Sequence, residues 1–125
     1  MAFWKWTTSN SNVDEQLSGA ALKASAVIWF SPQGEVLDVN ENFCAAMGYE
    51  RDEIVGKKHA LFVDPQYAKS DKYREFWSRL RNGERFSDTF RRIGKGGRDV
   101  WIEASYVPVT DQAGQVIKVV KFASD

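Results

Sequence analysis

The sequence predicts an α+β domain in which a five-stranded antiparallel sheet carries its helices on one face. Two β-forming runs lie in the first third of the chain, three lie in the last third, and the helical patterns lie between them. Strands followed by helices and then by more strands are typical of this class, because one layer of helices covers the apolar face of the sheet. The length of 125 residues fits one domain with a single core.

The first two strands are predicted to form a hairpin. Residues 26–30 read Ala-Val-Ile-Trp-Phe, a dense run of β-formers. Pro32 and Gly34 then mark a turn, and residues 35–39 form a second strand.

The middle of the chain is predicted to be helical. Asn40 is a suitable N-cap for a short helix that Gly48 ends, and residues 51–55 allow one more turn. Residues 64–82 carry the strongest helical pattern, with apolar residues at i, i+3, i+4 and i+7. Those positions are Tyr73, Phe76, Trp77 and Leu80.

The last three strands are predicted over residues 86–92, 100–109 and 116–122, with glycine-containing turns at 94–97 and 111–114. Alternate residues of the final strand face opposite sides of the sheet. We expect Ile117 and Val119 to face away from the helices, where a charge in place of Val119 would weaken contact with a partner.

An N-terminal segment, residues 1–24, precedes the main domain at residues 25–125. Within it, residues 13–24 predict a flanking helix with one apolar stripe. The stripe needs a partner surface, so we expect a homodimer formed through this helix and the sheet.

Composition narrows the function. Seventeen basic and seventeen acidic residues give zero net charge, which does not favour a nucleic-acid partner. The single Cys44 excludes an internal disulfide and is expected to be a buried helix residue.

No apolar run could span a bilayer and no secretory signal is visible, so a cytoplasmic location is expected. No catalytic set or metal-ligand spacing appears, which favours a binding module over an enzyme.

Several motifs resemble the PAS family. Residues 40–43 (Asn-Glu-Asn-Phe), 47–49 (Met-Gly-Tyr) and 52–56 look like the opening of a PAS domain, and residues 97–120 look like its closing hairpin. Residues 59–65 and 119–125 are similar to PAS domains of bacterial methyl-accepting chemoreceptors. The resemblance implies a sensory module that binds a cofactor or small ligand and passes a signal to a C-terminal signalling domain. The alternative is a ligand-free module for dimerisation or protein interaction.

The resemblance also implies an interior site. In flavin-binding PAS domains of aerotaxis receptors a tryptophan occupies the place of Trp77, which makes FAD the expected cofactor. Those domains carry an asparagine where this chain has Arg92, a donor that cannot accept a hydrogen bond. His59, the only histidine, could instead ligate haem iron. Cys44 lies too early in the chain for light-driven flavin adduct chemistry.

The candidate residues for this site are Trp77, Asn40, Phe43, His59, Phe90, Arg92 and Trp101. In the ligand-free alternative, the same space is filled by Trp77, Phe43, Phe90, Trp101 and Tyr106.

Overall fold

A computed structural model describes residues 25–124. All paired strands of its five-stranded sheet are antiparallel, in the order β2-β1-β5-β4-β3. The strands are β1 (Ala26–Phe30), β2 (Val36–Val39), β3 (Phe86–Ile93), β4 (Asp99–Thr110) and β5 (Val116–Ser124). This sheet confirms the predicted α+β class. The expected flanking helix over residues 13–24 lies outside the described residues.

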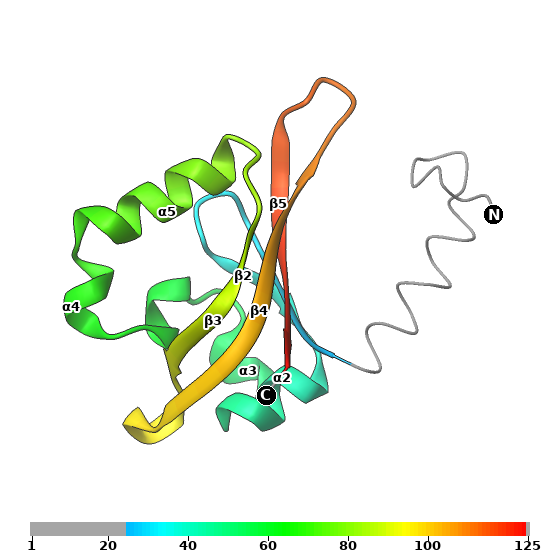
Figure 1. Cartoon of the computed structure of the whole chain (residues 1–125). Coiled ribbons are helices and arrows are strands. Elements are labelled where there is room, and N and C mark those ends of the chain that lie inside the picture. The colour runs from blue at the N-terminus through cyan, green and yellow to red at the C-terminus, as the bar shows by residue number, and fades with distance from the viewer. Residues whose placement is uncertain (1–24, 125) are drawn as a thin grey trace.

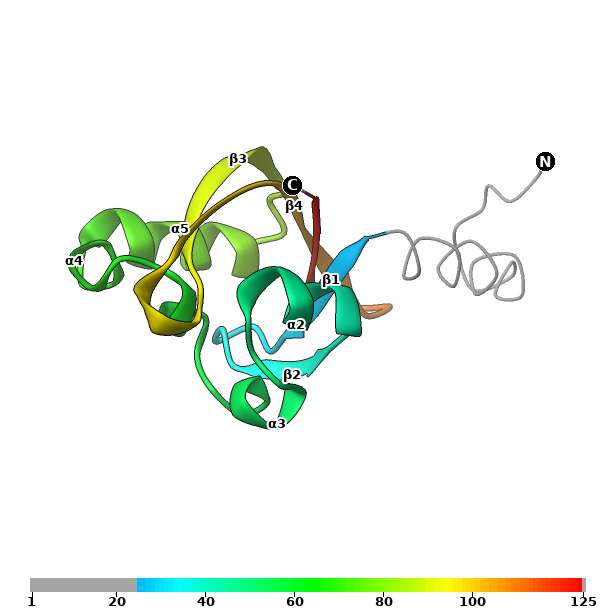
Figure 2. The ribbon, with the colours of Figure 1, turned by 90° about the horizontal axis from the view of Figure 1, so that it is seen from below.

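The helices gather on one face of the sheet (Figure 1). They are α2 (Glu41–Met47), α3 (Arg51–Ile54), the 3-10 helix η2 (His59–Phe62), α4 (Pro65–Ala68) and α5 (Asp71–Arg81), and a short η3 (Lys95–Gly97) joins β3 to β4. Figure 2 shows α2 and α3 beside the β1–β2 end of the sheet, whereas α5 contacts β4 and α4 packs on α5. Between residues 25 and 124, no helix has the length and apolar character needed to cross a membrane.

Asn40 begins α2 as predicted and also ties that helix to β1. Its side-chain oxygen accepts from the backbone N–H of Phe43 at 3.0 Å and from that of Val27 at 2.9 Å. Gly48 ends the helix with φ of 81°, a left-handed conformation that glycine adopts without strain.

The single helix predicted over residues 64–82 is wrong, because the chain divides it into α4 and α5. Asp64 caps α4 with Pro65 at its first position, and Ser70 caps α5 by accepting from the N–H of Tyr73 at 3.1 Å. Serine and aspartate bond readily to nearby backbone, so they start helices better than they continue them. The predicted apolar face remains intact within α5.

The prediction that Val119 faces away from the helices is also wrong. Val119 pairs with Phe30 of β1 and Pro108 of β4, and it is fully buried in the core. Alternate residues of one strand share a face, so Lys121 and Ala123 point toward the helices as well. The opposite, outer face carries Val120 and Phe122.

Candidate ligand-binding site

Six side chains with polar atoms meet between the sheet and the helices, and we call them the interior cluster. They come from η2, α5, β3, β4 and β5, so residues far apart in sequence converge on one place. All except Tyr73 are nearly or completely buried. The members of the interior cluster are His59, Tyr73, Trp77, Arg92, Tyr106 and Lys121.

The turn between β1 and β2 positions two members of the interior cluster. The backbone N–H of His59 donates to the carbonyl oxygen of Gly34 at 2.8 Å, which fixes the start of η2 against this turn. A Cβ atom at Gly34 would lie only 3.3 Å from Cε2 of Trp77, so the indole packs directly on the turn. The His59 ring then lies edge-on to the rings of Phe30 and Trp77.

A directed chain of hydrogen bonds crosses the interior cluster. The Arg92 guanidinium donates to the Tyr106 hydroxyl from Nη2 at 3.0 Å and from Nε at 3.3 Å. With both lone pairs engaged, Tyr106 donates its own proton to Nε2 of His59, 2.9 Å away. We therefore assign the imidazole proton to Nδ1, which donates to the Tyr73 hydroxyl at 2.8 Å. The chain of bonds joins β3 to α5.

Burial controls the charge of these groups. Desolvation lowers the pKa of His59 well below its ordinary value, and the charges of Arg92 and Lys121 lower it further. Desolvation, followed by the nearby Arg92, also lowers the pKa of Lys121 well below its usual range. Burial raises the pKa of Tyr73 to about 12. His59 is therefore neutral at pH 7, as the bond assignment requires.

Two buried donors of the interior cluster meet no acceptor among residues 25–124. One is Nζ of Lys121, which lies 5.1 Å from the ring centre of Tyr106 and 5.6 Å from that of Phe43. The other is Nε1 of Trp77, whose indole is near enough to lower the pKa of Tyr73 yet makes no hydrogen bond of normal geometry. Buried polar groups are nearly always paired, which sets these two donors apart from the other members of the interior cluster.

Close packing surrounds the interior cluster. Phe30, Phe76 and Leu80 fill the space between β1, β4 and α5, and each is less than a tenth exposed. A recess of about 10 Å³ lies beside Phe43. It is lined by Ala26, Phe43, Ala46, Met47, Ile102, Ala123 and Ser124. This volume is close to the minimum for one water molecule, so a larger ligand requires side chains to move.

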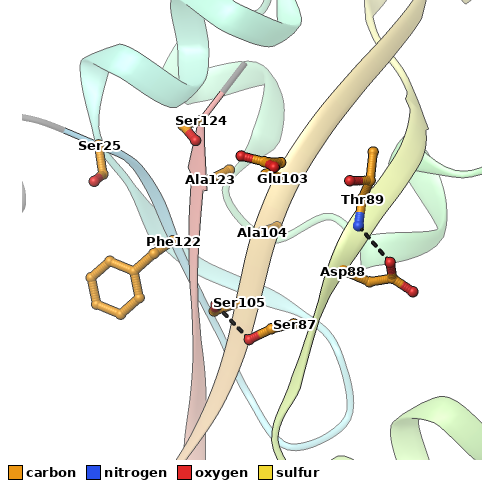
Figure 3. A pocket seen from close by; sticks show the side chains of 10 residues that line it. All are labelled: Ser25, Ser87, Asp88, Thr89, Glu103, Ala104, Ser105, Phe122, Ala123 and Ser124. Atoms are coloured by element: carbon orange, nitrogen blue, oxygen red, sulfur yellow. Dashed lines mark hydrogen bonds between the residues drawn. The ribbon is translucent and has the colours of Figure 1, made fainter.

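A separate, open hollow of about 430 Å³ lies on the outer face of the sheet. Figure 3 shows Phe122 projecting away from β5 and the hydroxyls of Ser87 and Ser105 joined across β3 and β4, at 2.7 Å. The hollow is lined by Ser25, Ser87, Asp88, Thr89, Glu103, Ala104, Ser105, Phe122, Ala123 and Ser124. Its walls are hydroxyls, methyl groups, the carboxylates of Asp88 and Glu103 and one aromatic ring, a mixed surface unlike the buried interior.

Comparison with known proteins identifies the family. The family model described as "PAS fold" matches residues 36–123. The chain belongs to the PAS family. Two curated proteins contain a similar segment. The biofilm dispersion protein BdlA of Pseudomonas aeruginosa is 52% identical over 107 residues, and the aerotaxis receptor of Escherichia coli is 27% identical over 77 residues.

This PAS domain spans only part of those relatives. The BdlA match covers 85% of this chain but 26% of BdlA, and the aerotaxis receptor match covers 62% of this chain and 15% of the receptor. Among solved structures, a PAS domain from Colwellia psychrerythraea superposes with a TM-score of 0.75 at 19% identity, covering 90% of this chain and 95% of that one. A light-oxygen-voltage domain studied with a flavin analogue gives 0.70 at 19% identity, covering 87% and 83%. These structural likenesses support the PAS fold.

The structure brings most of the predicted site residues together. Trp77, His59 and Arg92 belong to the interior cluster. Phe43 lies beside Lys121, and Phe90 lies 4.6 Å beneath the guanidinium of Arg92. These five residues come from four different elements of the PAS domain, so their convergence depends on the fold.

Two of the predicted residues lie elsewhere. Trp101 is 61% exposed, because alternation along β4 turns its neighbours Val100 and Ile102 inward and Trp101 outward. It is therefore no part of the interior site, and it does not fill the space in the ligand-free alternative. Asn40 serves as the cap of α2 and lines a hollow of about 590 Å³ beside that helix. Cys44, expected to be buried, is only half-buried.

Sequence reasoning missed Lys121 and Tyr73 as site residues. Each stands on the core-facing side of its element, Tyr73 in α5 and Lys121 in β5. A polar side chain at a core position is the signal by which the sequence could have pointed to them. The hairpin between β3 and β4 carries several basic residues, Arg91, Arg92, Lys95 and Arg98. Arg91 and Lys95 do form exposed ion pairs with Asp99 and Glu53, whereas Arg92 is buried.

Proposed function

We propose that this PAS domain is the sensory module of a chemotaxis-type signalling protein and binds a ligand or cofactor within the interior cluster. The signal then leaves through the C-terminal end of β5 toward a signalling region. The carrying observation is the pair of buried donors, on Lys121 and Trp77, that lack acceptors in residues 25–124. A non-enzymatic role and a cytoplasmic location complete the proposal.

FAD is the cofactor that we propose. A flavin ring presents several acceptor atoms along one edge, and the spare donors of Trp77, Arg92 and Lys121 match acceptors. The flavin's own N–H needs an acceptor, for which the hydroxyl of Tyr73 is available. When bound, a flavin supplies reversible redox chemistry. The aerotaxis receptor among the relatives, and the light-oxygen-voltage domains among the solved structures, support this choice.

Haem is the alternative cofactor, with His59 as the iron ligand. The imidazole is neutral, the form that binds iron, and it lies at the centre of the interior cluster. Both of its ring nitrogens are hydrogen-bonded to tyrosine hydroxyls, so one of these bonds must break to free a ligand atom. Haem binding would therefore disconnect either Tyr73 or Tyr106 from His59.

The visible spectrum tests these cofactors. We expect the purified protein, or protein reconstituted with FAD, to show the band of an oxidised flavin. Trp77→Phe should weaken flavin binding because it removes the N–H, whereas Trp101→Phe on the outer face should not. A Soret band that disappears in His59→Gln would identify haem, and not FAD, as the cofactor. A protein that stays colourless after addition of FAD and after addition of haem would contradict both cofactor proposals.

The second candidate function is a ligand-free interaction module. The packed aromatic interior favours it, because Phe30, Phe43, Phe76 and Tyr106 already fill the space that a large ring would occupy. In either function we propose a homodimer formed through the N-terminal helix and the outer face of the sheet. Apolar side chains that remain accessible on that face, the 61% exposed Trp101 and the half-buried Phe122, support this interface.

A further inference from the structure

The interior cluster holds two buried basic side chains and no buried acid to balance them. Arg92 and Lys121 both point from the sheet toward the helices, on either side of Tyr106. None of the ion pairs found among residues 25–124 includes either of them. A buried charge is ordinarily paired with an anion, and within residues 25–124 neither Arg92 nor Lys121 has one.

Counting hydrogen bonds gives the same result. The Tyr106 hydroxyl and the Arg91 carbonyl take three of the guanidinium N–H groups of Arg92. Lys121 and the indole of Trp77 make no hydrogen bond within the described part of the chain. Spare donors therefore converge from β3, β5 and α5. A carboxylate is acceptor-only and offers about four lone pairs, so it satisfies several of them at once.

The surroundings of Lys121 are apolar. Its ammonium faces the rings of Phe43 and Tyr106, and the pairs beside it on the inner face are small, such as Ala104 with Ala123. The recess of about 10 Å³ borders Phe43, whose ring also faces the end of the Lys121 side chain. A ligand placed here carries its charge at one end and an apolar or aromatic body at the other.

We infer that this PAS domain binds a small carboxylate with an apolar body, held by Lys121 and Arg92 in the interior cluster. This inference rests on the proposed binding function and gives it a ligand class. Lys121 supplies the principal charge, Arg92 supplies a second contact, and the rings of Phe43 and Tyr106 enclose the ligand body.

Titration of colourless protein with benzoate and acetate tests the inference. Isothermal calorimetry and thermal unfolding are measured at constant ionic strength, with sodium chloride replacing the carboxylate in the control. Benzyl alcohol serves as the uncharged compound with the same ring. We expect benzoate to bind and raise Tm, acetate to bind more weakly, and benzyl alcohol and chloride to give no comparable rise.

The variants assign the site. Lys121→Met should weaken benzoate binding about tenfold or more, the effect of losing one hydrogen bond to a charged group. Lys118→Met, on the outer face of the same strand, should bind as the wild type does, and Arg92→Gln provides a second test within the site. Absence of binding by both carboxylates, or equal binding by Lys121→Met, would overturn the inference.

These outcomes separate the inference from the proposed cofactors. A colourless protein that binds benzoate through Lys121 supports a carboxylate sensor without flavin or haem. A protein that takes up flavin or haem, but whose stripped form binds neither carboxylate, keeps the proposed function and removes this ligand class.

Discussion

Replacing Lys121 with Met is expected to stabilise the ligand-free domain. The side chain is completely buried, and its ammonium has no hydrogen-bond partner among residues 25–124. Burying a polar group without such a partner costs about 1–3 kcal/mol. Charge attraction to the rings of Tyr106 and Phe43 returns part of this, roughly 1 kcal/mol. Met has a similar unbranched shape and no polar atom, so we expect a gain of up to about 2 kcal/mol.

Urea unfolding followed by circular dichroism measures this gain. The midpoint should rise without a change in slope, and Tm should rise by roughly 4–8 °C for each kcal/mol in a domain of this size. Lys118→Met is the matched control, because it makes the same change on the outer face, and it should stay within about 0.5 kcal/mol of the wild type. A Lys121→Met protein less stable than the wild type would refute the reasoning, since Nζ would then make an interaction that stabilises the fold.

Three further predictions follow from the described contacts. Stability should fall as pH drops from about 6.5 toward 5, by up to about 1.4 kcal/mol per pH unit. In this pH range His59 binds a proton in the unfolded chain but not in the folded one, because burial lowers its pKa in the fold. Urea unfolding at each pH should show that the free energy of unfolding of His59→Gln changes less with pH. An equal change with pH in both proteins would contradict this origin. Asn40→Ala should cost about 1–2 kcal/mol in urea unfolding, and Asn40→Asp, which keeps the accepting oxygen, should cost less. Phe122→Glu should weaken self-association in sedimentation more than Thr89→Glu does, because Phe122 projects from the outer face (Figure 3); equal effects would argue against an interface at Phe122.

Local patterns predicted the elements whose stabilising contacts lie close in sequence. β1 begins and ends as predicted, and α2 begins after Asn40 and ends at Gly48, because dense β-formers, an N-cap and a C-terminal glycine act within one turn. The break between α4 and α5 was missed although Ser70 was visible. The helical spacing of apolar residues favoured one continuous helix in the prediction. In the structure, Ser70 accepts a hydrogen bond from the N–H of Tyr73 and so begins a new helix.

The candidate site was harder to predict from the sequence, because the burial of its polar side chains depends on the fold. In the sequence, the sets of alternate residues around Val119 and Val120 are both mostly apolar and each contains a lysine. The direction of β5 was therefore undecided until β1 and β4 fixed its register. His59 gave no local sign of burial either, since its place follows from the bond between η2 and Gly34.

The position of Lys121 also explains how binding could reach the rest of a signalling protein. It stands on β5, paired with Ile28 of β1 and Tyr106 of β4, three residues before the end of that strand at Ser124. A carboxylate that pairs with Lys121 and the spare N–H groups of Arg92 would lie beside Tyr106, which connects the guanidinium through His59 to α5. A ligand shifts a conformational equilibrium only by its difference in affinity for the two states. The buried Nζ of Lys121 provides such a difference, because burial disfavours its charge in the empty state and a carboxylate would stabilise that charge in the bound one. The stability gained in Lys121→Met should therefore be accompanied by loss of the response to benzoate, since one atom is responsible for both.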